Sequence, residues 1–159
     1  MGAERVRTPD VNVLVYATNL DAPQRAAAAR WLEEAFRDPA GIAFTWHALA
    51  AFLRLSTQGR IVPKALPLET ALQVMDEWLG HPRARIIGAT ERHAAVLGRL
   101  LIGAGRGGNL VGDAQLAAIA ISHGAVLGTF DRDFERFAGL RFEHLDSQSI
   151  PDLGSHYRA

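Results

Sequence analysis

Three aspartates lie at the ends of apolar segments, where folding would bring carboxylates together. Asp10 precedes the apolar run 11–17, Asp113 opens an alanine-rich segment, and Asp131 follows the run 125–130. Neighbouring carboxylates repel one another and resist ionisation, so a cluster of them calls for a compensating charge. Mg²⁺ and Mn²⁺ accept such oxygen ligands, and either ion can polarise a phosphodiester oxygen and activate water. The three aspartates therefore predict a metal site for hydrolysis.

Two of the aspartates also have a structural interpretation, which is the better one when either is considered alone. Asp113 is typical of a helix N-cap and Asp131 of a turn. The prediction of a metal site therefore rests on all three occurring together. Zinc is disfavoured because cysteine is absent and the histidines show no metal-binding spacing.

The composition indicates a single folded domain. With 159 residues, 48% of them hydrophobic, the chain can bury a core of its own. We expect the domain to occupy residues 1–145 and residues 146–159 to form a polar tail. The run 11–17 is too short to span a bilayer, so no membrane contact is expected. The absence of cysteine suits a reducing cytoplasm, which is the expected location.

The charge balance excludes a globally basic nucleic-acid-binding chain, because the formal net charge is zero. Any phosphate-binding surface must then be local, and Arg54 and Arg132 are candidates for it. For each of these arginines taken singly, an ordinary solvated side chain is the favoured interpretation.

Hydrophobic periodicity predicts strands that alternate with helices, which is typical of a parallel sheet with helices on both faces. Asp21 is expected to cap the first long helix. Helices are expected over 21–36, 46–56, 67–79, 90–102 and 113–123. Strands are expected over 41–45, 84–87, 125–130 and 141–144. The residues expected to face the core from the helix over 46–56 are Trp46, Leu49, Ala50 and Leu53.

Two segments carry a resemblance to a known family. DVNVLVYA (10–17) and GNLVGDAQLAAIAISHGAVLGTFDRDFERFAGLRF (108–142), in this order, resemble PIN-domain ribonucleases of the VapC toxin type. The resemblance extends over about Thr8–Leu145. It implies a PIN-like three-layer α/β/α sandwich with a central, mostly parallel sheet. It also implies RNA cleavage with Mg²⁺ or Mn²⁺ held by Asp10, Asp113 and Asp131, a VapB-type antitoxin as partner, and a homodimer.

The position of Asp10 depends on how the run 11–17 folds. Its β-branched residues are typical of a buried strand, whereas in the family the strand ends at the aspartate and a helix follows. Ligand sites of open parallel sheets lie beyond the carboxyl ends of the strands. We therefore predict a strand near 4–9 with Asp10 just after it. Nearby, Asn12 is expected to orient Asp10, and Thr129 to donate a hydrogen bond to a pocket carboxylate.

Asp133 has two open interpretations: it joins the acidic pocket, or it caps the short helix DFERF (133–137).

The chain departs from the family at Ala51. Many VapC-type chains have a glutamate before an arginine in this helix, where this sequence reads Ala51-Phe-Leu-Arg54. By helical spacing, His47, Ala51, Arg54 and Gln58 share one face of the helix. Three explanations stay open: a subgroup that works with aspartates alone, a substitution that silences the enzyme, or a non-catalytic relative. His47 is a minor candidate for a replacement ligand.

Two alternative functions follow. The first is a nuclease-dead PIN module that binds antitoxin or RNA without cleaving it. The second is a dinucleotide-binding domain, because the glycines of 103–108 match G-x-G-x-x-G. That motif requires a strand before it, and here a helical pattern precedes it.

Overall fold

A central parallel sheet organises the chain in the computed structural model, which describes residues 4–59 and 64–146. Its five strands follow the order β3-β2-β1-β4-β5, and every neighbouring pair is parallel. The three-layer sandwich predicted from the sequence is confirmed. The strands are β1 (Arg7–Pro9), β2 (Ile42–Phe44), β3 (Ala84–Ile86), β4 (Val126–Thr129) and β5 (Arg141–His144).

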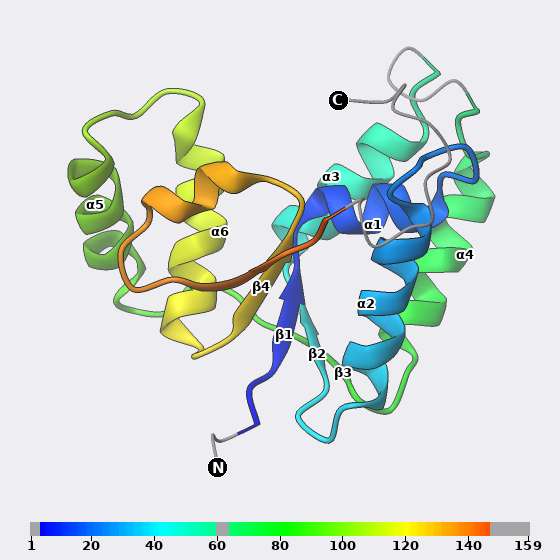
Figure 1. Cartoon of the computed structure of the whole chain (residues 1–159), viewed down its shortest axis with the longest axis horizontal. Helices are drawn as coiled ribbons and strands as arrows, with labels where there is room; N and C mark the ends of the chain where they lie inside the picture. Colours follow the sequence, from blue (N-terminus) through cyan, green and yellow to red (C-terminus); the bar gives the residue numbers. More distant parts are fainter. Residues whose placement is uncertain (1–3, 60–63, 147–159) are drawn as a thin grey trace.

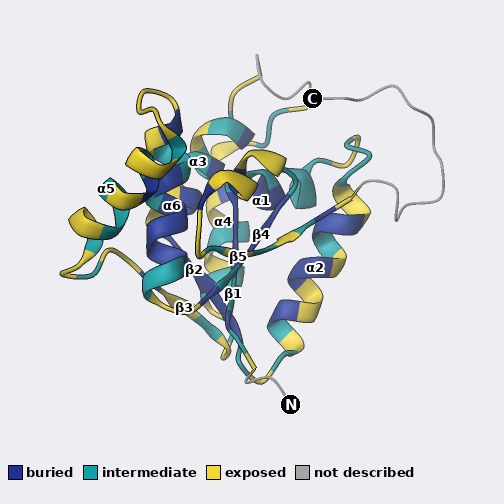
Figure 2. Cartoon of the chain, turned by 60° about the vertical axis from the view of Figure 1, so that its left-hand side comes forward, coloured by how far each residue is buried: buried dark blue, intermediate teal, exposed yellow. Residues whose placement is uncertain are grey.

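Helices cover both faces of the sheet, with one group on either side (Figure 1). One face carries α1 (Val11–Thr18), α2 (Arg25–Arg37), α3 (Trp46–Ser56) and α4 (Leu68–Leu79). The other face carries α5 (His93–Ala104) and α6 (Leu110–Ser122), and a 3₁₀ helix, η1 (Arg132–Arg136), follows β4. Figure 2 shows that α6 is largely buried, whereas the residues of α5 are mostly exposed or half-buried. No helix in the described ranges is long and apolar enough to cross a membrane.

A close contact between α2 and the sheet depends on Gly128 in β4. The indole ring of Trp31 lies so near this glycine that an added Cβ atom would be 2.3 Å from Trp31 Cζ2. Any larger residue at 128 would displace the indole or the strand, which costs stability in a close-packed interior. Gly128 pairs with Pro9, so this contact also supports the end of β1 that precedes Asp10.

The predicted elements are present, but several boundaries were wrong. Helix α2 begins at Arg25 and has no side-chain cap, so the capping role predicted for Asp21 is wrong. Asp21 lies before the helix and forms an exposed ion pair with Lys64 at 3.2 Å. Helix α5 begins at His93, three residues after the predicted start at Thr90. Helix α6 begins at Leu110, which places Asp113 inside its first turn, so the N-cap interpretation of Asp113 is wrong.

The predicted apolar stripe of α3 is also partly wrong. Leu49 is buried as expected, but Ala50 is exposed and Trp46 is 56% exposed. The core side of α3 consists instead of Ala48, Leu49, Phe52 and Ser56.

The glycine-rich segment 103–108 does not have the context of a dinucleotide site. Helix α5 runs up to Ala104 and ends at Gly105, whose φ of 76° is a left-handed helix cap. Since no strand precedes these glycines, the dinucleotide-binding alternative is wrong. The tail predicted at 146–159 lies outside the described residues, except for Asp146.

Candidate active site

The parallel sheet brings Asp10 and Asp131 to one edge. Strands β1 and β4 are neighbours, and the backbone N–H of Asp10 donates to the carbonyl of Gly128 at 2.8 Å. Asp10 follows β1 directly and Asp131 lies two residues after β4. The predicted strand before Asp10 and helix after it are both observed, so this part of the sequence interpretation is confirmed. Asp113 reaches the same edge from the first turn of α6.

The Asp10 carboxylate is buried and fixed by two short hydrogen bonds. Its Oδ1 accepts from the backbone N–H of Val11 at 2.7 Å, which also caps α1. Its Oδ2 accepts from the Thr129 hydroxyl at 2.7 Å, as the sequence predicted for Thr129. Asn12 acts one step further away: its amide donates to Thr129 Oγ1 at 3.4 Å and accepts from the N–H of Phe130 at 3.3 Å.

The pKa values of two aspartates are raised. Burial is the main reason that the pKa of Asp10 lies above its usual range; Thr129 and Val11 oppose the shift, and Asp131 adds to it. Burial, followed by repulsion from Asp10, Asp131 and Asp133, raises the pKa of Asp113 to about 6, while His47 acts in the opposite direction. Each shift therefore contains repulsion between aspartates that are far apart in the sequence, which means that these carboxylates share one electrostatic environment.

The donor set fits a hard divalent cation. Every candidate ligand is a carboxylate oxygen, and no arginine or lysine in the described residues lies within ion-pair distance of Asp10, Asp113 or Asp131. Within 4–59 and 64–146, no three acidic or histidine side chains form a ready metal cage. An ion at this edge would therefore complete its coordination with water or phosphate oxygens, as Mg²⁺ commonly does.

The residues after β4 have mainly local partners. Asp131 Oδ1 accepts from the N–H of Asp133 at 2.8 Å and thereby caps η1. The proposed capping role of Asp133 is therefore wrong; its carboxylate pairs with Arg136 at 3.3 Å instead. Arg132 forms an exposed pair with Glu135 at 3.6 Å.

One side of the site is formed by α3. Its first turn approaches α6 closely, since a Cβ atom on Gly112 would lie 3.7 Å from His47 Cε1. Ala51 follows one helical turn later and is partly buried, and Arg54 is exposed. The sequence placed His47 on this face by its spacing from Ala51, but only the approach of the first turn of α3 to Gly112 shows that it lies near Asp113.

The fold is a parallel α/β/α sandwich, and its candidate site consists of carboxylates at the carboxyl edge of the sheet. Comparison with known proteins identifies the family to which a chain with this fold and site belongs. The sequence profile of the PIN domain matches residues 8–140. Ribonuclease VapC37 of Mycobacterium tuberculosis is 41% identical over 134 residues, which cover 84% of this chain and 93% of the relative. Ribonuclease VapC33 of the same species is 35% identical over 134 residues, with 84% and 94% covered.

Solved structures agree with this assignment. The structure of VapBC2 from Rickettsia felis bound to promoter DNA matches with a TM-score of 0.65 and 25% identity, covering 88% of this chain and 98% of the matched chain. DNA-bound VapBC from Salmonella typhimurium has the same fold, with a TM-score of 0.62 at 18% identity and 89% and 98% covered. The chain therefore belongs to the PIN-domain family, and the predicted resemblance is confirmed.

Proposed function

We propose that this chain is a VapC-type endoribonuclease that cleaves RNA phosphodiesters with Mg²⁺ or Mn²⁺ held by Asp10, Asp113 and Asp131. The observation that carries the proposal is the position of these carboxylates at the carboxyl edge of the sheet, where no basic side chain among the described residues forms an ion pair with any of them. The named activity of relatives up to 41% identical, matched over most of both chains, supports the reaction class.

Each aspartate has a distinct part in the proposal. Asp10 is the most rigid, because two hydrogen bonds fix its carboxylate while each oxygen retains a second lone pair. Asp113, with a pKa of about 6, is mostly ionised at neutral pH and contributes negative charge that attracts a cation. Asp131 adds charge from the start of η1. A bound divalent ion supplies a Lewis acid that polarises the phosphodiester.

The direct experiment is RNA cleavage with and without divalent ions. Purified protein should cleave single-stranded RNA in Mg²⁺ or Mn²⁺ and stop in EDTA. Asp113→Asn should reduce cleavage, whereas Asp76→Asn should not. Asp76 is the matched control, because it is an exposed aspartate on α4 with the same change of charge. Cleavage that persists in EDTA would contradict the metal-dependent reaction.

Binding of the ion can be measured separately from catalysis. A ligand that binds only the native state raises its stability, by about 2.7 kcal/mol at a concentration one hundred times Kd. Millimolar Mg²⁺ or Mn²⁺ should therefore raise the melting temperature of the unaltered chain and have a smaller effect on Asp113→Asn. An unchanged melting temperature at saturating ion would contradict the proposed ligand set.

The proposal includes partners and a cellular setting. A VapB-type antitoxin is expected, since the structural neighbours are VapBC complexes. A homodimer, RNA contacts by Arg54 and Arg132, and a cytoplasmic location are further parts of the proposal. Co-expression with the gene beside it should yield a complex with a small partner, and its mass by light scattering would give the number of toxin copies.

A nuclease-dead module is the second candidate, and Ala51 favours it. A methyl group occupies the helix position at which many relatives of this type have a glutamate. Such a protein would bind antitoxin or RNA and show no cleavage with either ion, so the same assay distinguishes it from the nuclease.

A further inference from the structure

Trp46 is exposed at a position where the surrounding structure is rigid. It is the first residue of α3, directly after Thr45, which is buried and whose Oγ1 accepts from the N–H of Ala48 at 3.1 Å. The Thr45 carbonyl also accepts from the N–H of Leu49 at 3.0 Å. The backbone that carries Trp46 is thus fixed at both ends, yet its side chain is 56% exposed. Water contact with a large aromatic surface is unfavourable, so this placement needs an explanation.

The location of Trp46 distinguishes it from the other exposed apolar residues. Single exposed leucines and isoleucines such as Ile102, which is 83% exposed on α5, are ordinary surface features. Trp46 instead follows β2 at the carboxyl edge of the sheet, the edge that also carries Asp10. Its neighbour His47 approaches Gly112, the residue before Asp113. The indole therefore belongs to the first turn of the helix that borders the carboxylates.

Charge makes an aromatic surface useful at this edge. The chain has no net positive charge, and the carboxylates repel phosphate groups until a cation is bound. Contacts with the bases would add affinity for RNA to that of local phosphate contacts such as those proposed for Arg54 and Arg132. Unpaired bases stack on exposed aromatic side chains, and the stacking energy does not depend on phosphate charge.

We propose that Trp46 is a stacking platform for an unpaired base of single-stranded RNA, at the same edge of the sheet as the phosphodiester held at Asp10 and Asp113. This inference deepens the proposed ribonuclease function and rests on it for the location of the phosphodiester. The fixed start of α3 keeps the ring in place, so little conformational entropy is lost when a base binds.

The test measures RNA binding without cleavage. A labelled single-stranded oligonucleotide with non-hydrolysable linkages is titrated in Mg²⁺, and again in EDTA, with the unaltered chain, Trp46→Ala, Trp46→Phe and the control Ile102→Ala. Trp46→Ala should weaken binding by roughly 5- to 100-fold, the loss expected for one stacked base. Trp46→Phe should retain most of the affinity because it keeps an aromatic ring, and Ile102→Ala should bind like the unaltered chain.

Abasic substitutions in the RNA identify the stacked base. Replacing one nucleotide at a time by an abasic residue should reveal one position at which the unaltered chain loses affinity and Trp46→Ala loses none. Such non-additivity is the signature of direct contact between the two groups. Equal losses at every position for both proteins would overturn the proposal.

Other outcomes separate this inference from the proposed function. If RNA is cleaved but Trp46→Ala binds and cleaves as the unaltered chain does, stacking is refuted while the ribonuclease stands. If Trp46-dependent binding is found without cleavage in any metal, the platform stands and the ribonuclease fails. If Trp46→Ala changes only the mass of the protein or its capture of antitoxin, Trp46 belongs to a protein interface and the proposal is overturned.

Discussion

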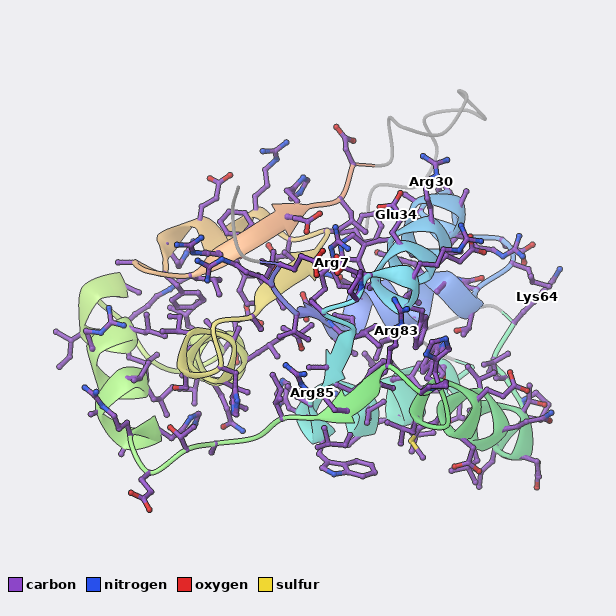
Figure 3. The ribbon with its side chains drawn as sticks, turned by 90° about the horizontal axis from the view of Figure 1, so that it is seen from below. Arg7, Arg30, Glu34, Lys64, Arg83 and Arg85 are labelled. Carbon is purple, nitrogen blue, oxygen red and sulfur yellow. The ribbon has the colours of Figure 1, made fainter. Side chains whose placement is uncertain are left out.

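The charged side chains at the amino end of strand β1 form ion pairs, whereas the carboxylates at its carboxyl end have no basic partner among the described residues. At the amino end, Arg7 pairs with Asp38 and with Glu143, each at 3.1 Å. Figure 3, seen from the amino ends of the strands, shows Arg7 in the middle of the molecule, with Arg83 and Arg85 near β3. At the carboxyl end, Asp10 is more deeply buried, and its charged neighbours include Asp131.

This difference separates a structural site from a site prepared for a ligand. Partly buried charges that are paired with opposite charges are neutralised by residues of the protein itself. Carboxylates whose pKa values are raised by burial and by neighbouring carboxylates, as those of Asp10 and Asp113 are, reduce stability when ionised. Such arrangements occur where a substrate or ion supplies the missing charge. The comparison predicts that changes at the carboxyl edge affect activity, and that changes at the amino edge affect stability.

The largest expected effect is on catalysis at the carboxyl edge. Asp10→Asn removes the charge of the most rigid candidate ligand, so RNA cleavage should fall by at least about 100-fold. Stability without metal should fall little, because the substitution also removes a buried charge. Thermal melts in EDTA check this point. A large drop in melting temperature together with retained cleavage would show that Asp10 serves stability and not catalysis.

The next effect is on stability at the amino edge. Arg7→Met retains the aliphatic contacts of the side chain but leaves Asp38 and Glu143 without their shared partner. Because all three side chains are partly exposed, we expect a loss of about 1–3 kcal/mol in the free energy of unfolding. Urea unfolding measures it. Cleavage at saturating RNA should stay near that of the unaltered chain, and a large loss of cleavage would show that the two ends are coupled.

The pH dependence of stability provides a smaller effect. Since the pKa of Asp113 rises from 3.8 in the unfolded chain to about 6 in the native state, the native state binds more protons between these values. The contribution of Asp113 is therefore complete below about pH 4 and is lost as the pH rises through 6. Asp10 shifts in the same direction.

Urea unfolding in EDTA at several pH values checks this sign. Asp113→Asn should flatten the profile above pH 4, whereas Asp76→Asn should leave it unchanged. A metal-free protein whose stability rises steadily through pH 6, with no influence of Asp113, would contradict the clustering of the carboxylates.

The smallest expected effect concerns Ala51. If the aspartates suffice, the unaltered chain cleaves RNA, and Ala51→Glu changes the rate by about tenfold or less, as expected for a supporting position near a metal. If Ala51 silences the enzyme, only the glutamate variant cleaves. If the chain is a non-catalytic relative, neither cleaves. Parallel assays of both proteins at equal Mn²⁺ concentration distinguish the three cases.

Much of the fold was predictable because it follows from local pattern. The bounds of α3 and β5 match the predicted 46–56 and 141–144. The sequence did not predict the start of α2, because residues 19–25 form turns before the helix, in which Arg25 N–H donates to the Ala22 carbonyl at 3.1 Å. Nor did it predict the exposure of Trp46, since the residues that cover the first turn of a helix come from elsewhere in the chain.

The sequence by itself determined that three aspartates would follow or open particular elements, and that Thr129 would be available to bind one of them. Only the tertiary structure decided that these aspartates influence one another. Asp10 and Thr129 are 119 residues apart, yet they are joined by a 2.7 Å hydrogen bond. Local propensities act over a few residues, whereas the pairing of β1 with β4 and the packing of α6 set such distances. The order of the strands in the sheet therefore turned separate acidic residues into one site.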